Sequence, residues 1–130
     1  MNGQSITGKT GFAKTVVSNE NTAEKIGSGD LPVFATPMMI ALMEKAACVA
    51  IADYLDEEQT SVGTKISISH TAASPVGAVI TASAEIISVD GRKIEFKITA
   101  SDNAGEIGSG THTRFIIDGD RFMQKAEGRK

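Results

Sequence analysis

The pattern of hydrophobic and polar positions divides the chain into an alternating segment, a polar loop, an apolar helix and a second alternating region. Residues 7–17 predict a strand, and the polar, glycine-containing residues 18–32 predict a surface loop. Residues 37–55 are apolar on nearly every side of a helix, interrupted by Glu44 and Lys45. Such a pattern predicts a helix that is buried on nearly every side.

The start of this helix has its own signals. Thr36 is of a type favoured at an N-cap, and Pro37 suits the first helical position, where a missing N–H is no loss. Cys48 lies among Ala and Val residues, which indicates core packing. Glu44 has two interpretations, a solvated seam of the helix or a paired group in its apolar surroundings.

The remaining residues predict an antiparallel sheet. In residues 61–71 one face is apolar, and it includes His70 and four other residues, Val62, Thr64, Ile66 and Ile68. Hairpin and turn signals at Asp90-Gly91 and at residues 102–105 separate the further strands 78–88, 92–100 and 106–117. Asp118-Gly119 is followed by a short final segment.

One long apolar helix with four strand signals after it predicts an α+β fold, with the antiparallel sheet wrapped around the helix. The length of 130 residues is typical of one hydrophobic core, so we expect a single domain over residues 1–130. Because one small sheet covers a helix incompletely, we also expect a two-fold homodimer.

Composition and charge narrow the function. The chain carries 13 basic and 16 acidic residues, a net charge of −3, and nucleic acid is therefore a poor partner. A single cysteine and the lack of zinc-ligand spacing predict a cytoplasmic protein without a structural metal. The first ten residues lack the apolar core of a signal peptide, and the uncharged residues 31–43 are too few to cross a membrane, so we expect no membrane partner.

Three polar residues in apolar surroundings are the candidates for chemistry: Thr36, Glu44 and His70. Each has a structural explanation of its own, but a glutamate beside a histidine would raise the basicity of the imidazole, which could activate a hydroxyl or a water. Thr36 and Glu44 lie roughly 12 Å apart along a helix axis. A joint site therefore needs long side-chain reach or a second subunit.

The order and spacing of four segments are similar to those of a known family. The segments are VFATPMMIALMEKAAC at 33–48, SVGT at 61–64, SHTAASPVG at 69–77 and GSGTHTR at 108–114. Together they resemble the hot dog-fold acyl-CoA thioesterases of the fluoroacetyl-CoA thioesterase type. The resemblance covers most of the chain.

This resemblance implies a dimeric hot dog fold that hydrolyses an acyl-CoA to a free acid and coenzyme A without a cofactor. The family's catalytic threonine, glutamate and histidine fall on Thr36, Glu44 and His70, and Gly63 and Arg114 correspond to residues near the acyl group. Residues 27–30 are Gly-Ser-Gly-Asp where the fluoroacetyl-selective member has bulky aromatic residues. Selectivity for fluoroacetyl is therefore not carried over.

Several questions stay open at this level. Thr36 is either the nucleophile or a hydroxyl that positions water, and Glu44 either partners His70 or activates the water. Because Pro37 has no N–H, the oxyanion donors would be the amides of Met38, Met39 or Gly63. The alternatives to a thioesterase are a non-catalytic acyl-CoA-binding protein and a hydratase on the same architecture. For coenzyme A phosphates the candidate cations are Lys65, Arg92, Lys93 and Arg114, with Arg114 preferred, and His112 is interpreted as an ordinary strand residue.

Overall fold

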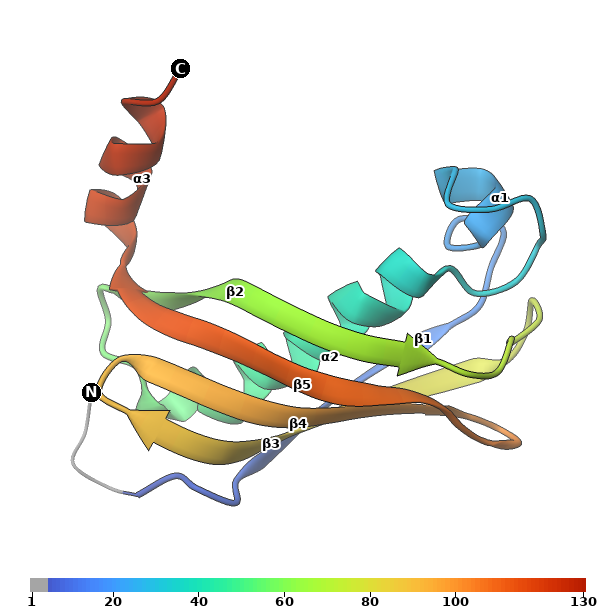
Figure 1. The fold of residues 1–130 in the computed structure, drawn as a ribbon, viewed down its shortest axis with the longest axis horizontal. Coiled ribbons are helices and arrows are strands. Elements are labelled where there is room, and N and C mark those ends of the chain that lie inside the picture. Colours follow the sequence, from blue (N-terminus) through green and yellow to red (C-terminus); the bar gives the residue numbers. More distant parts are fainter. Residues whose placement is uncertain (1–4) are drawn as a thin grey trace.

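The computed structural model describes residues 5–130, which form a curled antiparallel sheet around a central helix (Figure 1). The elements in chain order are β1 (Thr10–Val16), α1 (Ala23–Ile26), α2 (Thr36–Ile51), a 3-10 turn (Ala52–Tyr54), β2 (Gln59–His70), β3 (Val79–Asp90), β4 (Lys93–Asp102), β5 (Gly105–Asp118) and α3 (Gly119–Glu127). The predicted α+β architecture is confirmed.

The sheet has the strand order β1-β3-β4-β5-β2, so β1 and β2 are its edges. The hairpin between β3 and β4 turns at Gly91, whose φ of 61° lies in the left-handed region, as the Asp-Gly signal predicts. β2 pairs with β5 from Gln59↔Asp118 to His70↔Gly108. The other edge of β2 has no neighbouring strand within residues 5–130.

Helix α2 packs on β1, β3 and β4 and touches β2 only lightly. Its buried side is made of Met39, Leu42, Met43, Ala46, Ala47, Ala50 and Ile51. The small side chains allow β1 to approach closely, because a Cβ at Gly11 would overlap the carbonyl oxygen of Ala46. Burial on nearly every side was a wrong prediction, since Ala41, Lys45, Cys48 and Val49 are exposed and the sheet covers one side only.

A bulge in β2 changes which side chains face the helix. The register shifts between Gly63, which pairs with Arg114, and Lys65, which pairs with Thr113. Before the bulge the odd-numbered positions face α2, and after it the even-numbered positions do, because one extra residue reverses the alternation. The prediction of one continuous apolar face from Val62 to His70 is therefore wrong at its beginning.

Two helices lie outside the predicted elements. The predicted loop 18–32 contains α1, which Thr22 caps by accepting a hydrogen bond from the Lys25 amide at 3.3 Å. The final segment is α3, capped by Asp118, which accepts from the Arg121 amide at 3.1 Å. Within residues 5–130 no helix has the length and apolar character needed to span a bilayer.

Candidate functional site

Thr36 and His70 form a direct pair at one end of the molecule. The Thr36 hydroxyl lies 2.7 Å from Nδ1 of His70, the last residue of β2. Thr36 is not the N-cap that the sequence predicts, because Ala35 occupies that position and Thr36 begins α2 itself. Its hydroxyl is thereby left to contact the imidazole instead of a backbone amide.

The second nitrogen of the same ring has no visible partner. Nε2 of His70 is inaccessible to solvent and has no hydrogen-bond partner within residues 5–130. Buried polar groups in folded proteins are nearly always paired, so this nitrogen is an exception that an account of the site has to explain.

A cavity of about 280 Å³ opens beside this pair, between the α1 region and the segment that follows β2. Thr36 and His70 line it together with Thr71, Ala72 and Ala73. A hydrogen bond of 2.8 Å from the buried Ser74 hydroxyl to Asp102 holds the end of this segment against the β4–β5 turn. The same bond, with those from the backbone, lowers the pKa of Asp102, so the carboxylate stays charged.

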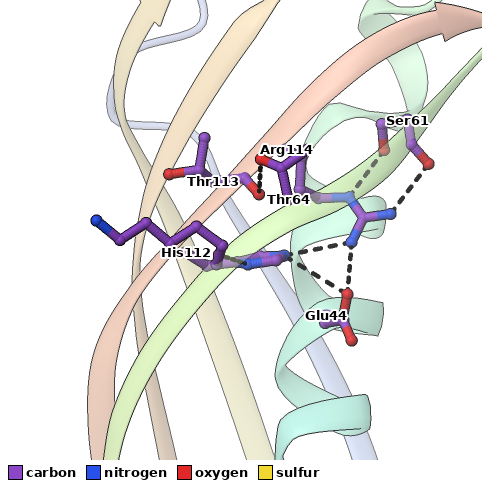
Figure 2. A network of polar contacts seen from close by, with 7 residues as sticks. Glu44, Ser61, Thr64, His112, Thr113 and Arg114 are labelled. Atoms are coloured by element: carbon purple, nitrogen blue, oxygen red, sulfur yellow. Dashed lines mark hydrogen bonds and ion pairs between the residues drawn. The ribbon is translucent and has the colours of Figure 1, made fainter.

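Glu44 lies in a different cluster, where the middle of α2 faces the middle of β2 (Figure 2). Its Oε2 accepts a hydrogen bond from Nη1 of Arg114 at 3.0 Å, and Nε2 of His112 is 3.9 Å away. The side chain of Glu44 is 40% exposed, whereas that of Arg114 is 8% exposed. The carboxylate therefore faces a partly open space while its cation is held inside.

Arg114 is fixed by several partners at once. Its Nε donates to the Ser61 hydroxyl at 2.9 Å and its Nη2 donates to the Ser61 carbonyl at 3.0 Å. Because Ser61 and Gly63 precede the bulge, they share the α2-facing side with Arg114. The planar guanidinium is thus locked in one orientation toward Glu44.

His112 completes this cluster and was missed as a functional candidate. Its Nδ1 donates to the Lys65 carbonyl at 2.8 Å, which leaves Nε2 free to accept from Arg114 Nη1 at 3.2 Å. Burial, together with the Arg114 cation, lowers the pKa of His112. The ring is therefore a neutral acceptor. The sequence could have indicated this role by its spacing, since His112 and Arg114 are two residues apart on one strand and therefore share a face.

Gly63 leaves room for the carboxylate of Glu44. A Cβ at this position would lie 2.5 Å from Glu44 Oε2 and 3.2 Å from Arg114 Nη1. A second cavity, of about 270 Å³, opens here and is lined by residues that include Glu44, Gly63, Thr64 and His112. Any side chain at position 63 would displace the acid from its contact with Arg114.

The structure therefore sorts the predicted site residues into two groups. Thr36 and His70 meet at one end of β2, and Glu44, Gly63 and Arg114 meet in its middle. The predicted contact between Glu44 and His70 is wrong within a single chain, because the acid contacts Arg114 and the histidine contacts Thr36.

One further expectation, about the oxyanion donors, changes with the structure. The amides of Met38 and Met39 both donate to the Ala35 carbonyl at 3.0 Å, so these two of the three predicted oxyanion donors are engaged within the helix. Within the described part of the chain, no three His, Cys, Asp or Glu side chains gather as a metal-binding group.

Similarity to known proteins agrees with this site and fold. Residues 17–120 match the family model "fluoroacetyl-CoA-specific thioesterase". The fluoroacetyl-CoA thioesterase of Streptantibioticus cattleyicolor is 46% identical over 93 residues, which are 72% of this chain and 67% of that protein.

Solved structures of fluoroacetyl-CoA thioesterases are also similar to this chain. A crystal structure of a mutant fluoroacetyl-CoA-specific thioesterase superposes over 100% of both chains with a TM-score of 0.91 and 35% identity. Another, in complex with fluoroacetate and CoA, covers 89% of this chain and 98% of its own at 38% identity and a TM-score of 0.84. A Thermus thermophilus thioesterase superfamily member, 24% identical over 95% of this chain and 93% of its own, shares the fold with a TM-score of 0.85.

These findings confirm the predicted hot dog fold and favour a catalytic thioesterase over a protein that only binds acyl-CoA. The chain therefore belongs to the fluoroacetyl-CoA-specific thioesterase family and is an acyl-CoA thioesterase.

Proposed function

We propose that the protein hydrolyses an acyl-CoA in a site that two copies of the chain build together, with Thr36 and His70 from one copy and Glu44 from the other. The observation that carries this proposal is the unpaired, buried Nε2 of His70, whose other nitrogen already contacts the Thr36 hydroxyl. An imidazole that accepts a proton through Nδ1 needs an acceptor for the N–H on its opposite side. A carboxylate supplies that acceptor and stabilises the imidazolium.

The free edge of β2 supports the proposed homodimer. An unpaired edge strand of twelve residues favours pairing with another strand, and two-fold symmetry would pair β2 antiparallel with its copy. Gly63 and His70 both face α2, and an axis near the middle of the residues between them would bring Gly63 of one copy close to His70 of the other. Glu44, which lies against Gly63, would then approach the empty side of His70.

Hydrolysis follows from these positions. The His70 imidazole takes a proton from the Thr36 hydroxyl or from a water held by it, and the oxygen attacks the thioester carbonyl carbon. Arg114 and the Gly63 amide would lie near the acyl group, where a donor stabilises the oxyanion. When the carbon–sulfur bond breaks, His70 returns the proton to the departing sulfur. If Thr36 is the nucleophile, a water releases the acid from the acyl-threonine in a second round.

The residues that line the cavity determine which acyl groups it can accept. Small residues are among those that line the Thr36–His70 cavity, including Ala23, Ser28 and Ala72. We infer that the pocket accepts acyl groups beyond the fluoroacetyl group named for the relatives. Coenzyme A is part of the substrate, and no separate cofactor is proposed.

A thiol-release assay over short, branched, aryl and long acyl-CoAs tests the proposal. Turnover is expected with at least one of these substrates, and Thr36→Ala, Glu44→Ala and His70→Ala should each reduce it strongly. Hydrolysis that stays within a few-fold of the parent in all three variants would contradict the assigned roles. The single domain over residues 1–130 and the cytoplasmic location stay predictions from the sequence.

A further inference from the structure

Helix α3 carries a basic ridge that the proposed reaction does not use. Arg121 and Lys125 are four residues apart, so they lie along one side of the helix, and Arg129 follows just beyond its C-terminal end. All three are exposed, and none makes an ion pair or a side-chain hydrogen bond within residues 5–130. Arg92, at the β3–β4 turn, joins Arg121 and Lys125 in lining a hollow of about 450 Å³.

These four cations lie near one another, and none of them forms an ion pair within residues 5–130. Lys9, Lys93 and Lys130 each form an ion pair with a neighbouring acid, and Arg114 is bound by Glu44. Asp118, the acid in the same hollow, is already bound to the Arg121 amide as the cap of α3. The hollow therefore combines three cations, Arg92, Arg121 and Lys125, with one carboxylate, and its net positive charge is an arrangement that attracts phosphate groups.

An apolar surface runs beside the ridge. Phe122 is 41% exposed and is shared by the first hollow and by a second one of about 250 Å³. Ala126, one turn further along α3, lines the second hollow with Lys125 and Arg129. An exposed aromatic ring between cations suits a ligand that combines phosphate groups with a flat base.

The position of α3 decides which thioester site it could serve. The helix begins where Asp118 pairs with Gln59, at the opposite end of β2 from His70 (Figure 1). Eleven residue steps of strand separate these ends by roughly 36 Å. That span is longer than the pantetheine arm of coenzyme A. In an antiparallel β2–β2 pair, however, the Gln59 end of one copy approaches the His70 end of the other.

We propose that the hollow formed by Arg92, Arg121, Phe122 and Lys125 binds the nucleotide 3′,5′-bisphosphate end of the acyl-CoA whose thioester lies in the Thr36–His70 cavity of the second copy. This inference rests on the proposed function. It deepens that function by assigning the nucleotide end of the substrate to the partner's C-terminal helix.

The double variant Arg121→Gln, Lys125→Gln tests the hollow by comparing two substrates. One is an acyl-CoA, and the other is the same acyl group on N-acetylcysteamine, which has no phosphate. The ratio of kcat/KM for the first to kcat/KM for the second should fall at least about tenfold, because two charge-assisted contacts are lost. The change should lie in KM for acyl-CoA, and the salt dependence of that KM should weaken. Lys14→Gln, which removes one exposed cation on β1, should keep the ratio of the parent.

Mixed dimers test the placement in the second copy. In a mixed dimer, one chain carries His70→Ala and keeps the native α3, and the other carries Arg121→Gln and Lys125→Gln and keeps His70. The native His70 of the second chain then faces the native α3 of the first. The KM for acyl-CoA of these dimers should equal that of the parent. A raised KM would overturn the assignment to the second copy.

Binding of adenosine 3′,5′-bisphosphate, measured by calorimetry, separates this inference from the proposed function, because binding needs no turnover. The parent should bind it more tightly than inorganic phosphate, and the double variant should lose this binding. An active thioesterase whose double variant keeps the substrate ratio and the bisphosphate affinity would overturn the inference. An inactive protein whose bisphosphate binding depends on Arg121 and Lys125 would overturn the proposed function and keep the nucleotide site.

Discussion

The Thr36–His70 pair and the cluster around Glu44 are both polar sites on α2 and β2, but they differ in how completely one chain satisfies them. In the cluster, Glu44, Arg114, His112 and Ser61 bind one another. At the pair, Nε2 of His70 is buried with no partner among residues 5–130. One chain thus satisfies the polar groups of the cluster, whereas it leaves Nε2 of His70 unpaired, and the proposed function assigns the partner of this nitrogen to a second copy.

This contrast also separates what each region contributes to the reaction. A group held by several partners, such as Arg114, keeps a fixed orientation and fits the role of a preorganised donor. A histidine with one free nitrogen can exchange protons, because no neighbouring group of the same chain fixes both of its nitrogens. We therefore expect substitutions at the pair to act on turnover and substitutions in the cluster to act on both stability and turnover.

The largest effect is expected at His70. Replacing it with alanine removes the proposed general base and should lower kcat by about 100-fold or more. Because Thr36 is exposed and His70 is half-buried, the free energy of unfolding should change little. Thiol release and chemical denaturation measure the two quantities. A variant that loses stability together with activity would show that the pair is structural.

The next effect is expected at Arg114. Arg114→Ala would leave the Ser61 carbonyl and His112 Nε2 without their donor, and the free energy of unfolding should fall by about 2 kcal/mol. Arg114→Lys keeps the charge but cannot bind all three partners in one plane, so it should recover only part of the loss. Urea denaturation of both variants measures this order. Equal stability of parent, lysine and alanine variants would contradict the role of the cluster.

A smaller effect is expected at Gly63. A methyl group there would lie 2.5 Å from Glu44 Oε2, so Gly63→Ala should push the carboxylate off Arg114 and lower kcat about tenfold. Gly77→Ala is a suitable control for replacing a glycine away from the cluster. Nothing lies within 4 Å of the Cβ added at Gly77, so this substitution strains only the backbone, through its positive φ. Unchanged turnover in Gly63→Ala would mean that Glu44 does not act from this position.

The smallest effect concerns His112 and pH. Since burial lowers its pKa from the usual 6.5, the unfolded chain binds a proton more readily than the folded one. The contribution of His112 to stability is therefore full above pH 6.5 and is lost as the pH falls toward the lowered value. His112→Gln should flatten the stability curve in this acid range. The same slope in parent and variant would contradict a neutral His112 held by Arg114.

Parts of this architecture follow directly from the sequence. The helix over α2, the hairpin at Asp90-Gly91 and the antiparallel sheet were predicted because periodicity and turn residues act locally. The bulge in β2 was not predicted, because Thr64 continues the alternation in the sequence and the extra residue shows only in the pairing with β5. The contact partners of Glu44 depend on that bulge, which turns Gly63 and Arg114 toward the helix.

Mixed dimers of Glu44→Ala and His70→Ala chains test the central claim most directly. In a composite site, each mixed dimer regains one intact site, from Thr36 and His70 of one chain and Glu44 of the other. Random pairing makes about half of the dimers mixed, so activity should recover to about a quarter of the parent. Activity no higher than that of either variant alone, in dimers shown to be mixed, would contradict a site shared between two copies.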